Sequence, residues 1–256
     1  MPDQNATRAY WVVMVGLVGL EREKNMARWL VQLSGERADL EEFPRSFPNG
    51  EVFAIEENEA FFLVGPAFEV LPDAQTVLGE AVRALDRFTA AISLLWPSLR
   101  KPTATHVFRE TDEGRRDAFV FVSAVLSGRA KVHAVAVSVG ETQQVPQVTQ
   151  AQELLERTSG SPHLEIALSL WADQMRSWPR LYRIIEEIEQ HLGKHVDAAG
   201  LCTASQRERF TRTANTAEVS GPDARHATGK FAAPSNPMSL PEATEFVRKM
   251  LLSVLR

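Results

Sequence analysis

The pattern of hydrophobic and polar positions divides the chain into a β-rich first part and a helical second part. In the first part, Ala9–Leu20 is a continuous apolar run with β-branched and aromatic residues, which is typical of a strand buried on both faces. Two shorter runs, Glu51–Ile55 and Ala60–Val64, lie on either side of Asn58 and predict a hairpin. Ala118–Leu126 and Ala130–Val139 predict a second hairpin, because a Ser-Gly-Arg turn separates them.

The segment Leu71–Trp96 changes from the period of a strand to the period of a helix. Its start is marked by Pro72-Asp73 and its end by Trp96-Pro97, because the residue before a proline avoids the helical region. The apolar positions recur at spacings of three and four, as one face of an amphipathic helix requires. They are Leu78, Ala81, Leu85, Phe88, Ile92 and Leu95.

The sequence after about residue 150 predicts an antiparallel bundle of four helices joined by short turns and one longer loop. Ser161-Pro162 is typical of a helix start, and Trp178-Pro179 separates the first helix from the second. Gly193 is a natural end for the second helix. Ser205–Ala217 predicts a weaker third helix, and the capping-box pattern Ser239-Leu240-Pro241-Glu242 begins the fourth.

These elements together predict an α+β fold. An N-terminal domain over residues 1–148 is expected to carry a mostly antiparallel sheet with one long helix packed on it, and an all-α four-helix bundle is expected over residues 149–256. The boundary is placed at the end of the polar stretch Gly140–Thr149, which contains Pro146 and reads as a linker.

Composition and charge narrow the class of protein. Apolar residues make up 44% of the chain, and the net charge of −5 argues against a general nucleic-acid coat protein but leaves room for a local basic patch. Cys202 is the single cysteine, so no disulfide can form within the chain and a cytoplasmic protein is expected. The 12 residues of Ala9–Leu20 are too few to cross a bilayer, so no membrane association is expected.

The best candidate for chemistry is the turn-rich link Ser220–Ala227, which precedes the last helix. Arg225 can bind a phosphate with two parallel hydrogen bonds, and His226 can move a proton near neutral pH. The preceding helix supplies Arg209 and Arg212, which are three residues apart and share a face, and Lys230 follows the turn. The link therefore predicts a small anion or phosphate site. The alternative is structural: Arg225 pairs with Asp223, and His226 bonds to the backbone.

A helical bundle with an Arg and a His shortly before a final apolar helix resembles HEPN domains, over roughly residues 161–256. These domains bind or cleave RNA in bacterial toxin–antitoxin and antiphage systems. The usual family signature places the His four to six residues after the Arg, whereas Arg225 and His226 are adjacent here. The resemblance thus implies a bundle that binds RNA and either cleaves it or has lost the ability to cleave it.

The resemblance also implies how cleavage would proceed. No metal and no cofactor would be needed: the RNA 2′-hydroxyl would attack the adjacent phosphate, His226 would act as base or acid, and Arg225 would stabilise the developing charge. Arg209, Arg212 and Lys230 would contact phosphates. Because HEPN sites are commonly built across a dimer, a two-fold homodimer is the matching expectation. A rival hypothesis is a non-catalytic adaptor that binds a partner protein and uses the bundle for dimerisation.

A zinc site was the remaining possibility for chemistry. His191 and His195 are four residues apart and would share a face in a continuous helix, with Cys202 as a third ligand. Gly193 lies between them and is expected to end the helix, so structural or solvent-exposed roles are favoured and no metal site is predicted. The sequence also contains no glycine-rich phosphate loop and no nucleophile elbow.

Overall fold

A computed structural model of the chain has an α+β fold, as the sequence predicts. It describes residues 28–111, 113–120, 148–221, 224 and 233–256. The described strands form one antiparallel sheet in the order β2-β3-β1-β4-β5. Their bounds are β1 Arg28–Ser34, β2 Phe53–Glu57, β3 Ala60–Val64, β4 Thr103–Glu110 and β5 Arg116–Val120.

The hairpin predicted around Asn58 is confirmed, with β2 beginning at Phe53 and extending to Glu57. Asn58 and Glu59 form its tip, and both have positive φ angles, 52° and 63°. Two residues with positive φ are what a tight two-residue turn between twisted strands requires, and Asn tolerates this conformation better than most residues.

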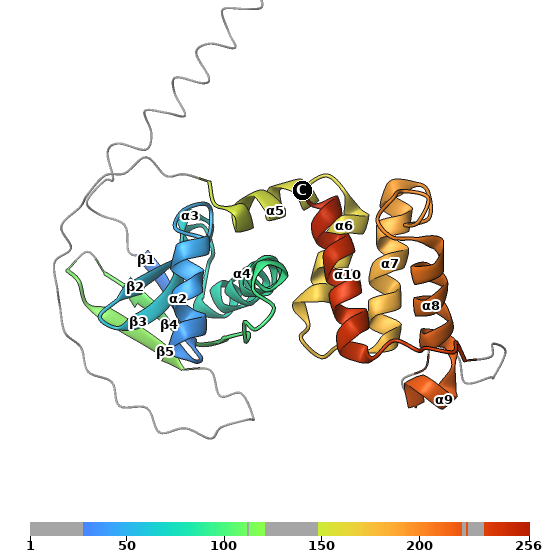
Figure 1. Ribbon diagram of the computed structural model, residues 1–256. Coiled ribbons are helices and arrows are strands. Elements are labelled where there is room, and N and C mark those ends of the chain that lie inside the picture. The colour runs from blue at the N-terminus through green and yellow to red at the C-terminus, as the bar shows by residue number, and fades with distance from the viewer. Residues whose placement is uncertain (1–27, 112, 121–147, 222–223, 225–232) are drawn as a thin grey trace, which may run out of the picture.

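Three helices belong to the sheet half of the molecule: α2 (Arg37–Ser46), α3 (Pro66–Glu69) and α4 (Ala74–Leu95). The long helix α4 confirms the prediction for Leu71–Trp96, and Asp73 caps it by accepting a hydrogen bond of 2.8 Å from the Thr76 amide. Figure 1 shows α2 and α4 on one side of the sheet. Alternate β1 residues Trp29, Val31 and Leu33 join the core on that side, whereas Leu30 packs with Phe62 and Val64 on the other.

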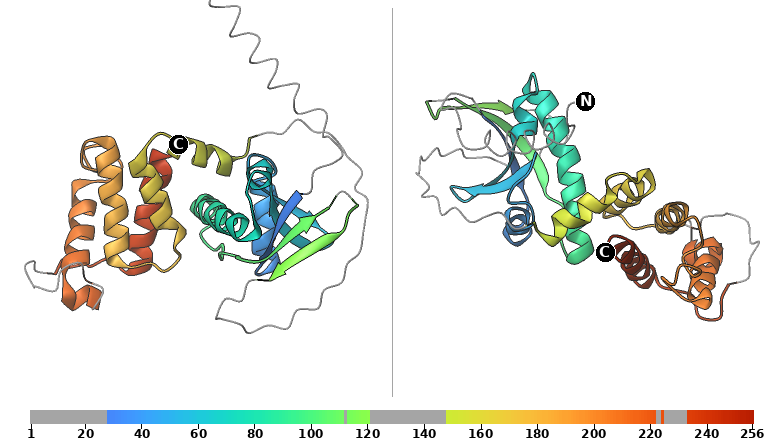
Figure 2. Two further views of the ribbon diagram at one scale, coloured as in Figure 1. Left: turned by 180° about the vertical axis from the view of Figure 1, so that it is seen from behind. Right: turned by 90° about the horizontal axis from the view of Figure 1, so that it is seen from above.

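The second half is helical, with α6, α7, α8 and α10 side by side as a bundle (Figures 1 and 2). The predicted helix starts at Ser161 and Ser239 are confirmed, and Gly193 ends α7 with a φ of 64°. The bounds are α5 Gln150–Thr158, α6 Pro162–Ala172, α7 Trp178–Leu192, α8 Ala204–Asn215, α9 Ala217–Ser220 and α10 Leu240–Val254. The helix α5 was not predicted as a separate element.

One hydrophobic core runs through both halves. Trp171 of α6 is buried against α4, and its indole Nε1 donates a hydrogen bond of 3.0 Å to the buried Ser93 hydroxyl. A second contact between the two halves joins α5 to the segment between α2 and β2, where the Gln152 side chain donates to the Asn49 carbonyl at 3.0 Å. The domain boundary at residue 148 remains a prediction, but the halves that it separates are packed together over a shared core.

Several sequence-based expectations fall outside the described residues, namely the strand Ala9–Leu20 and the second hairpin beyond Val120. Within the described part, β5 covers the beginning of that hairpin. The sequence reading missed β1, α2 and β4. No described helix is both long and apolar enough to cross a membrane.

Candidate functional site

The predicted site residues divide into two groups in the structure. Arg225, His226 and Lys230 belong to the link between α9 and α10 and lie outside the described residues. Arg209 and Arg212 are on α8, on the turns that lead toward this link. The structure therefore shows where Arg209 and Arg212 lie, and the roles of Arg225, His226 and Lys230 stay predictions.

Arg209 holds the end of the link against α8. Its Nη1 and Nη2 bind the two carboxylate oxygens of Glu242 at 2.6 and 2.9 Å. Its Nε donates to the Asn236 carbonyl at 2.6 Å, and Nη2 also donates to the Pro237 carbonyl at 3.3 Å. The hydrogen bond from Arg209 holds the pKa of Glu242 below its usual value. Arg209 thus has a structural function, and a contact between it and RNA stays a prediction.

The helix start at Ser239 differs from the capping box that the sequence predicts. The Ser239 hydroxyl accepts a hydrogen bond of 3.3 Å from the Glu242 amide, which is one half of the motif. The Glu242 side chain instead forms the two-pronged pair with Arg209. Two parallel hydrogen bonds between a guanidinium and a carboxylate are stronger than a single bond from the uncharged Ser239 amide to the same carboxylate, which explains the exchange of partners.

Thr213 of α8 anchors both ends of the link. On one side, the Ser220 hydroxyl donates to the Thr213 carbonyl. On the other, the Met238 amide donates to the Thr213 hydroxyl oxygen at 3.2 Å, while that hydroxyl donates to the Arg209 carbonyl at 2.7 Å. Thr213 is fully buried, so this junction is part of the bundle interior. The link between Ser220 and Met238 is therefore closed at its base on one turn of α8.

Arg212 lies on the same turn of α8. Its Nη1 is 3.4 Å from a carboxylate oxygen of Glu208, one turn earlier, and 38% of its side chain is exposed. An exposed pair of this kind contributes little to stability, because water screens the charges and the long side chains lose freedom. Arg212 therefore places a positive charge beside the base of the link.

His195 and Cys202, two of the residues that a zinc site would need, lie between α7 and α8. His195 Nδ1 lies 2.8 Å from Nη2 of Arg207 and 3.1 Å from Glu189, whereas His191 bonds elsewhere. Burial raises the pKa of the Cys202 thiol, which makes it a poor ligand at neutral pH. No cluster of three or more potential metal ligands occurs among the residues that the structure describes.

A further group of polar residues, which the sequence reading missed, lies where α6 begins beside the end of α7. Glu187 of α7 is 2% exposed and accepts from His163 Nδ1 at 2.7 Å and from Arg183 Nη2 at 2.5 Å. One turn later, His191 Nδ1 lies 2.9 Å from the Ser161 hydroxyl. The spacing of Arg183, Glu187 and His191 at intervals of four was the available signal, because such residues share a helix face.

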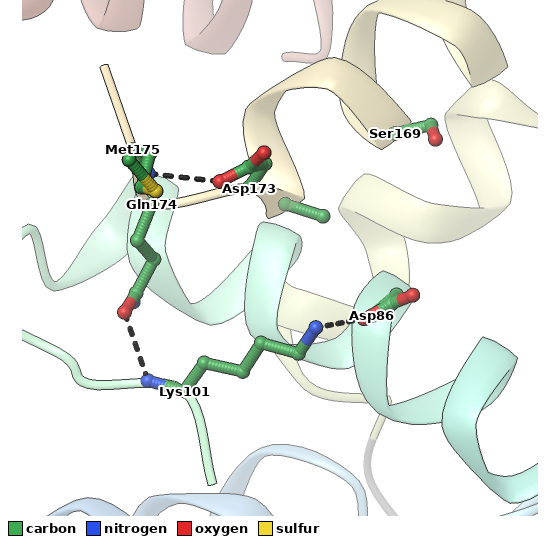
Figure 3. Close-up of a pocket in the computed structure, with 7 residues that line it drawn as sticks. Asp86, Lys101, Ser169, Asp173, Gln174 and Met175 are labelled. Carbon is green, nitrogen blue, oxygen red and sulfur yellow. Dashed lines mark hydrogen bonds and ion pairs between the residues drawn. The ribbon is translucent and has the colours of Figure 1, made fainter. Parts of the chain in front are cut away.

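A surface pocket lies where the α4–β4 connection meets the α6–α7 connection (Figure 3). Lys101 forms an ion pair with Asp86, and the Lys101 amide donates to Gln174 at 3.0 Å. A hydrogen bond from the Met175 amide lowers the pKa of Asp173, and Arg180 adds to this effect. The polar groups of the pocket therefore hold the two halves of the molecule together. The complete lining is Asp86, Lys101, Ser169, Ala172, Asp173, Gln174 and Met175.

The comparisons with known proteins add no family to this geometry. No family model, no curated protein and no solved structure matches the chain. The functional argument therefore rests on the residues themselves.

Proposed function

We propose that the chain is a HEPN-like helical protein that binds single-stranded RNA through the link between α9 and α10. The observation that supports this most is the closure of the link on Thr213, from both Ser220 and Met238. A loop that is anchored at both ends on a rigid helix can present its side chains in a fixed region, which is how binding residues are commonly positioned.

The residues of the link suit a phosphate backbone. Arg225 offers a planar fork that matches phosphate oxygens, and Lys230 adds a second charge within the same loop. Arg212 lies at the base of the loop and extends the same contact surface along α8. His226 is the residue to which the resemblance assigns proton transfer during cleavage.

Three further statements belong to the same proposal. The protein acts in the cytoplasm, for which the single cysteine is the support. It forms a two-fold homodimer through the bundle, as HEPN domains commonly do. Its biological setting is a bacterial toxin–antitoxin or phage-defence system, where this class of bundle is common.

RNA binding by the full-length protein tests the proposal. We expect Arg225→Ala to weaken binding of a labelled single-stranded RNA about tenfold and to lower the salt dependence by about one counterion. Arg157→Ala is the matched control, because it removes the same charge from α5 and should leave the affinity unchanged.

The His226→Ala variant, assayed for cleavage of the same RNA, tests the role of His226 separately. An absence of RNA binding by the wild-type protein at low salt would contradict the proposal and leave the adaptor hypothesis ahead.

A further inference from the structure

The geometry points to a second site, formed where α6 begins beside the end of α7, in which His163 and His191 act as the base and the acid of RNA cleavage. This assignment rests on the proposed function in one respect, which is that RNA is the ligand. The site is distinct from the link, because it lies at the other end of α7. Phe210, near the anchored link, contacts Trp178 at the start of α7, whereas Ser161 bonds to His191 near its end.

Among the residues that the structure describes, His163 is held through one nitrogen. Its Nδ1 lies 2.7 Å from a carboxylate oxygen of Glu187, and a carboxylate can only accept a hydrogen bond. Nδ1 therefore carries the proton, and the neutral imidazole has its lone pair on Nε2. The side chain of His163 is 44% exposed although Glu187 is buried, so the imidazole extends from a fixed anchor toward solvent. This is the state of a positioned general base.

His191 is held so that its outer nitrogen can donate a proton. The Ser161 hydroxyl oxygen accepts the Leu164 amide at 3.4 Å, as the cap of α6. Its second lone pair lies 2.9 Å from His191 Nδ1 and can accept a hydrogen bond from it. In the protonated imidazole, Nδ1 donates to Ser161, and the proton on Nε2 can be given to a leaving group. His191 is exposed, as a general acid must be.

The anchors of the two imidazoles are close enough together for one phosphate group to lie between them. Their anchors on α7, Glu187 and His191 itself, are one turn apart, which corresponds to a rise of about 6 Å. A phosphate with a hydrogen bond on each side can bridge such a distance. Arg183 lies one turn before Glu187 on the same face and is 58% exposed, and it shares the Glu187 carboxylate with His163, so its guanidinium places positive charge near His163.

An acid and a base of opposite protonation fit the cleavage of RNA by its own 2′-hydroxyl. His163 Nε2 takes the 2′-hydroxyl proton while the 2′-oxygen forms a bond to phosphorus. The bond from phosphorus to the 5′-oxygen breaks, and that oxygen takes the proton from His191 Nε2. The products are a 2′,3′-cyclic phosphate and a 5′-hydroxyl. Proton exchange with water then restores both imidazoles.

The test uses asparagine substitutions in the full-length protein. The Asn amide occupies the place of the imidazole Nδ1, so His163→Asn keeps a donor for Glu187 and loses only Nε2. In the same way, His191→Asn keeps a bond to Ser161 and loses only the outer nitrogen. The matched control is His195→Asn, because His195 also has its hydrogen bond at Nδ1, with Arg207, just after the end of α7.

We expect each of the two substitutions to lower the rate of cleavage of a labelled single-stranded RNA by about 100-fold or more. RNA affinity and the melting temperature should stay at the wild-type values, and His195→Asn should cleave normally. An RNA with 2′-deoxy sugars should bind without being cleaved, because its nucleophile is missing.

The outcomes separate this inference from the proposed function. Cleavage that survives both Asn substitutions, or that is lost only in His226→Ala, overturns the second site and leaves the link as the RNA site. RNA binding by the wild-type protein without any cleavage overturns the second site as well. A failure to bind RNA at all overturns both proposals.

Discussion

Two corners of the bundle use their polar side chains in different ways. At the α8–α10 corner, all three nitrogens of the Arg209 guanidinium are engaged, with Glu242 and with the carbonyls of Asn236 and Pro237. At the α6–α7 corner, the bonds that hold His163 and His191 within the described part of the chain are made through Nδ1. The first arrangement fixes the course of the backbone. The second fixes the orientation of an imidazole and leaves its Nε2 atom facing solvent.

The two corners show that a charged residue in a sequence motif is not necessarily available to bind a ligand or to exchange a proton. Arg209 and Arg212 are three residues apart on α8. Arg209 binds Glu242 and two carbonyls of the link, whereas Arg212 pairs with Glu208 of its own helix. What decides availability is the number of a side chain's polar atoms that the fold already satisfies. An imidazole anchored on one nitrogen is both oriented and able to exchange a proton.

The largest expected difference between the corners comes from changing each glutamate to glutamine. In Glu187→Gln, the new amide can donate to His163 Nδ1, which moves the proton to Nε2 and removes the base. We expect RNA cleavage to fall by about 100-fold or more. Glu242→Gln changes the same group at the other corner and should leave cleavage within about twofold of wild type. Equal cleavage by both variants would show that His163 is not oriented for catalysis.

Stability should show the reverse order. Arg209→Ala leaves Glu242 and two carbonyls without their donor, and we expect a loss of about 2 kcal/mol in the free energy of unfolding. Arg209→Lys should restore little of it, because an ammonium cannot reproduce the fork. Arg183→Ala removes one of two donors to the buried Glu187 carboxylate and should cost about 1 kcal/mol, because His163 still donates to Glu187. Urea unfolding of the three variants measures these values, and a larger loss for Arg183→Ala would reverse the comparison.

The closure of the link gives a third prediction. Thr213→Val keeps the shape of the side chain but removes the acceptor of the buried Met238 amide, which should cost about 1–2 kcal/mol. Limited proteolysis should then cut the link faster than in the wild type. Thr244→Val is the control, because its hydroxyl donates to the Leu240 carbonyl of its own helix and its loss should change the free energy of unfolding by less than about 0.5 kcal/mol. If the protease cuts the link of Thr213→Val no faster than that of the wild type, the anchoring of the link by Thr213 is contradicted.

The smallest predicted effect is the pH dependence of the Arg209–Glu242 pair. Because the pKa of Glu242 is lowered in the folded state, the pair stabilises the fold above the unfolded value of 4.5 and loses this contribution as the pH falls below it. The side chain is 46% exposed, so the contribution is about 0.5 kcal/mol. The difference in unfolding free energy between wild type and Glu242→Gln should therefore shrink from pH 7 to pH 3. A difference that grows would have the wrong sign.

Much of the fold could be predicted from the sequence, because strong periodicity and turn chemistry marked it. The long helix α4, the β2–β3 hairpin and the starts of α6 and α10 all carry such signals. The strands β1 and β4 were missed because charged and polar residues interrupt their apolar alternation. Gln32 lies within β1, for example, and Thr105 and His106 lie within β4.

The candidate site was less predictable, because its contacts join residues that are far apart in the sequence. Arg209 and Glu242 are 33 residues apart, and His163 and Glu187 are 24 residues apart. Helix-face spacing places Arg183, Glu187 and His191 together, but it cannot show that α6 brings Ser161 and His163 to them. That information comes from the antiparallel packing of α6 on α7.

The most direct test of this account is photochemical crosslinking of the full-length protein to a labelled single-stranded RNA, with the crosslinked peptides identified by mass spectrometry. We predict crosslinks in the α9–α10 link and at the α6–α7 corner around His163 and His191, at opposite ends of α7. Crosslinks confined to the sheet half of the molecule, or none at all under low salt, would contradict it.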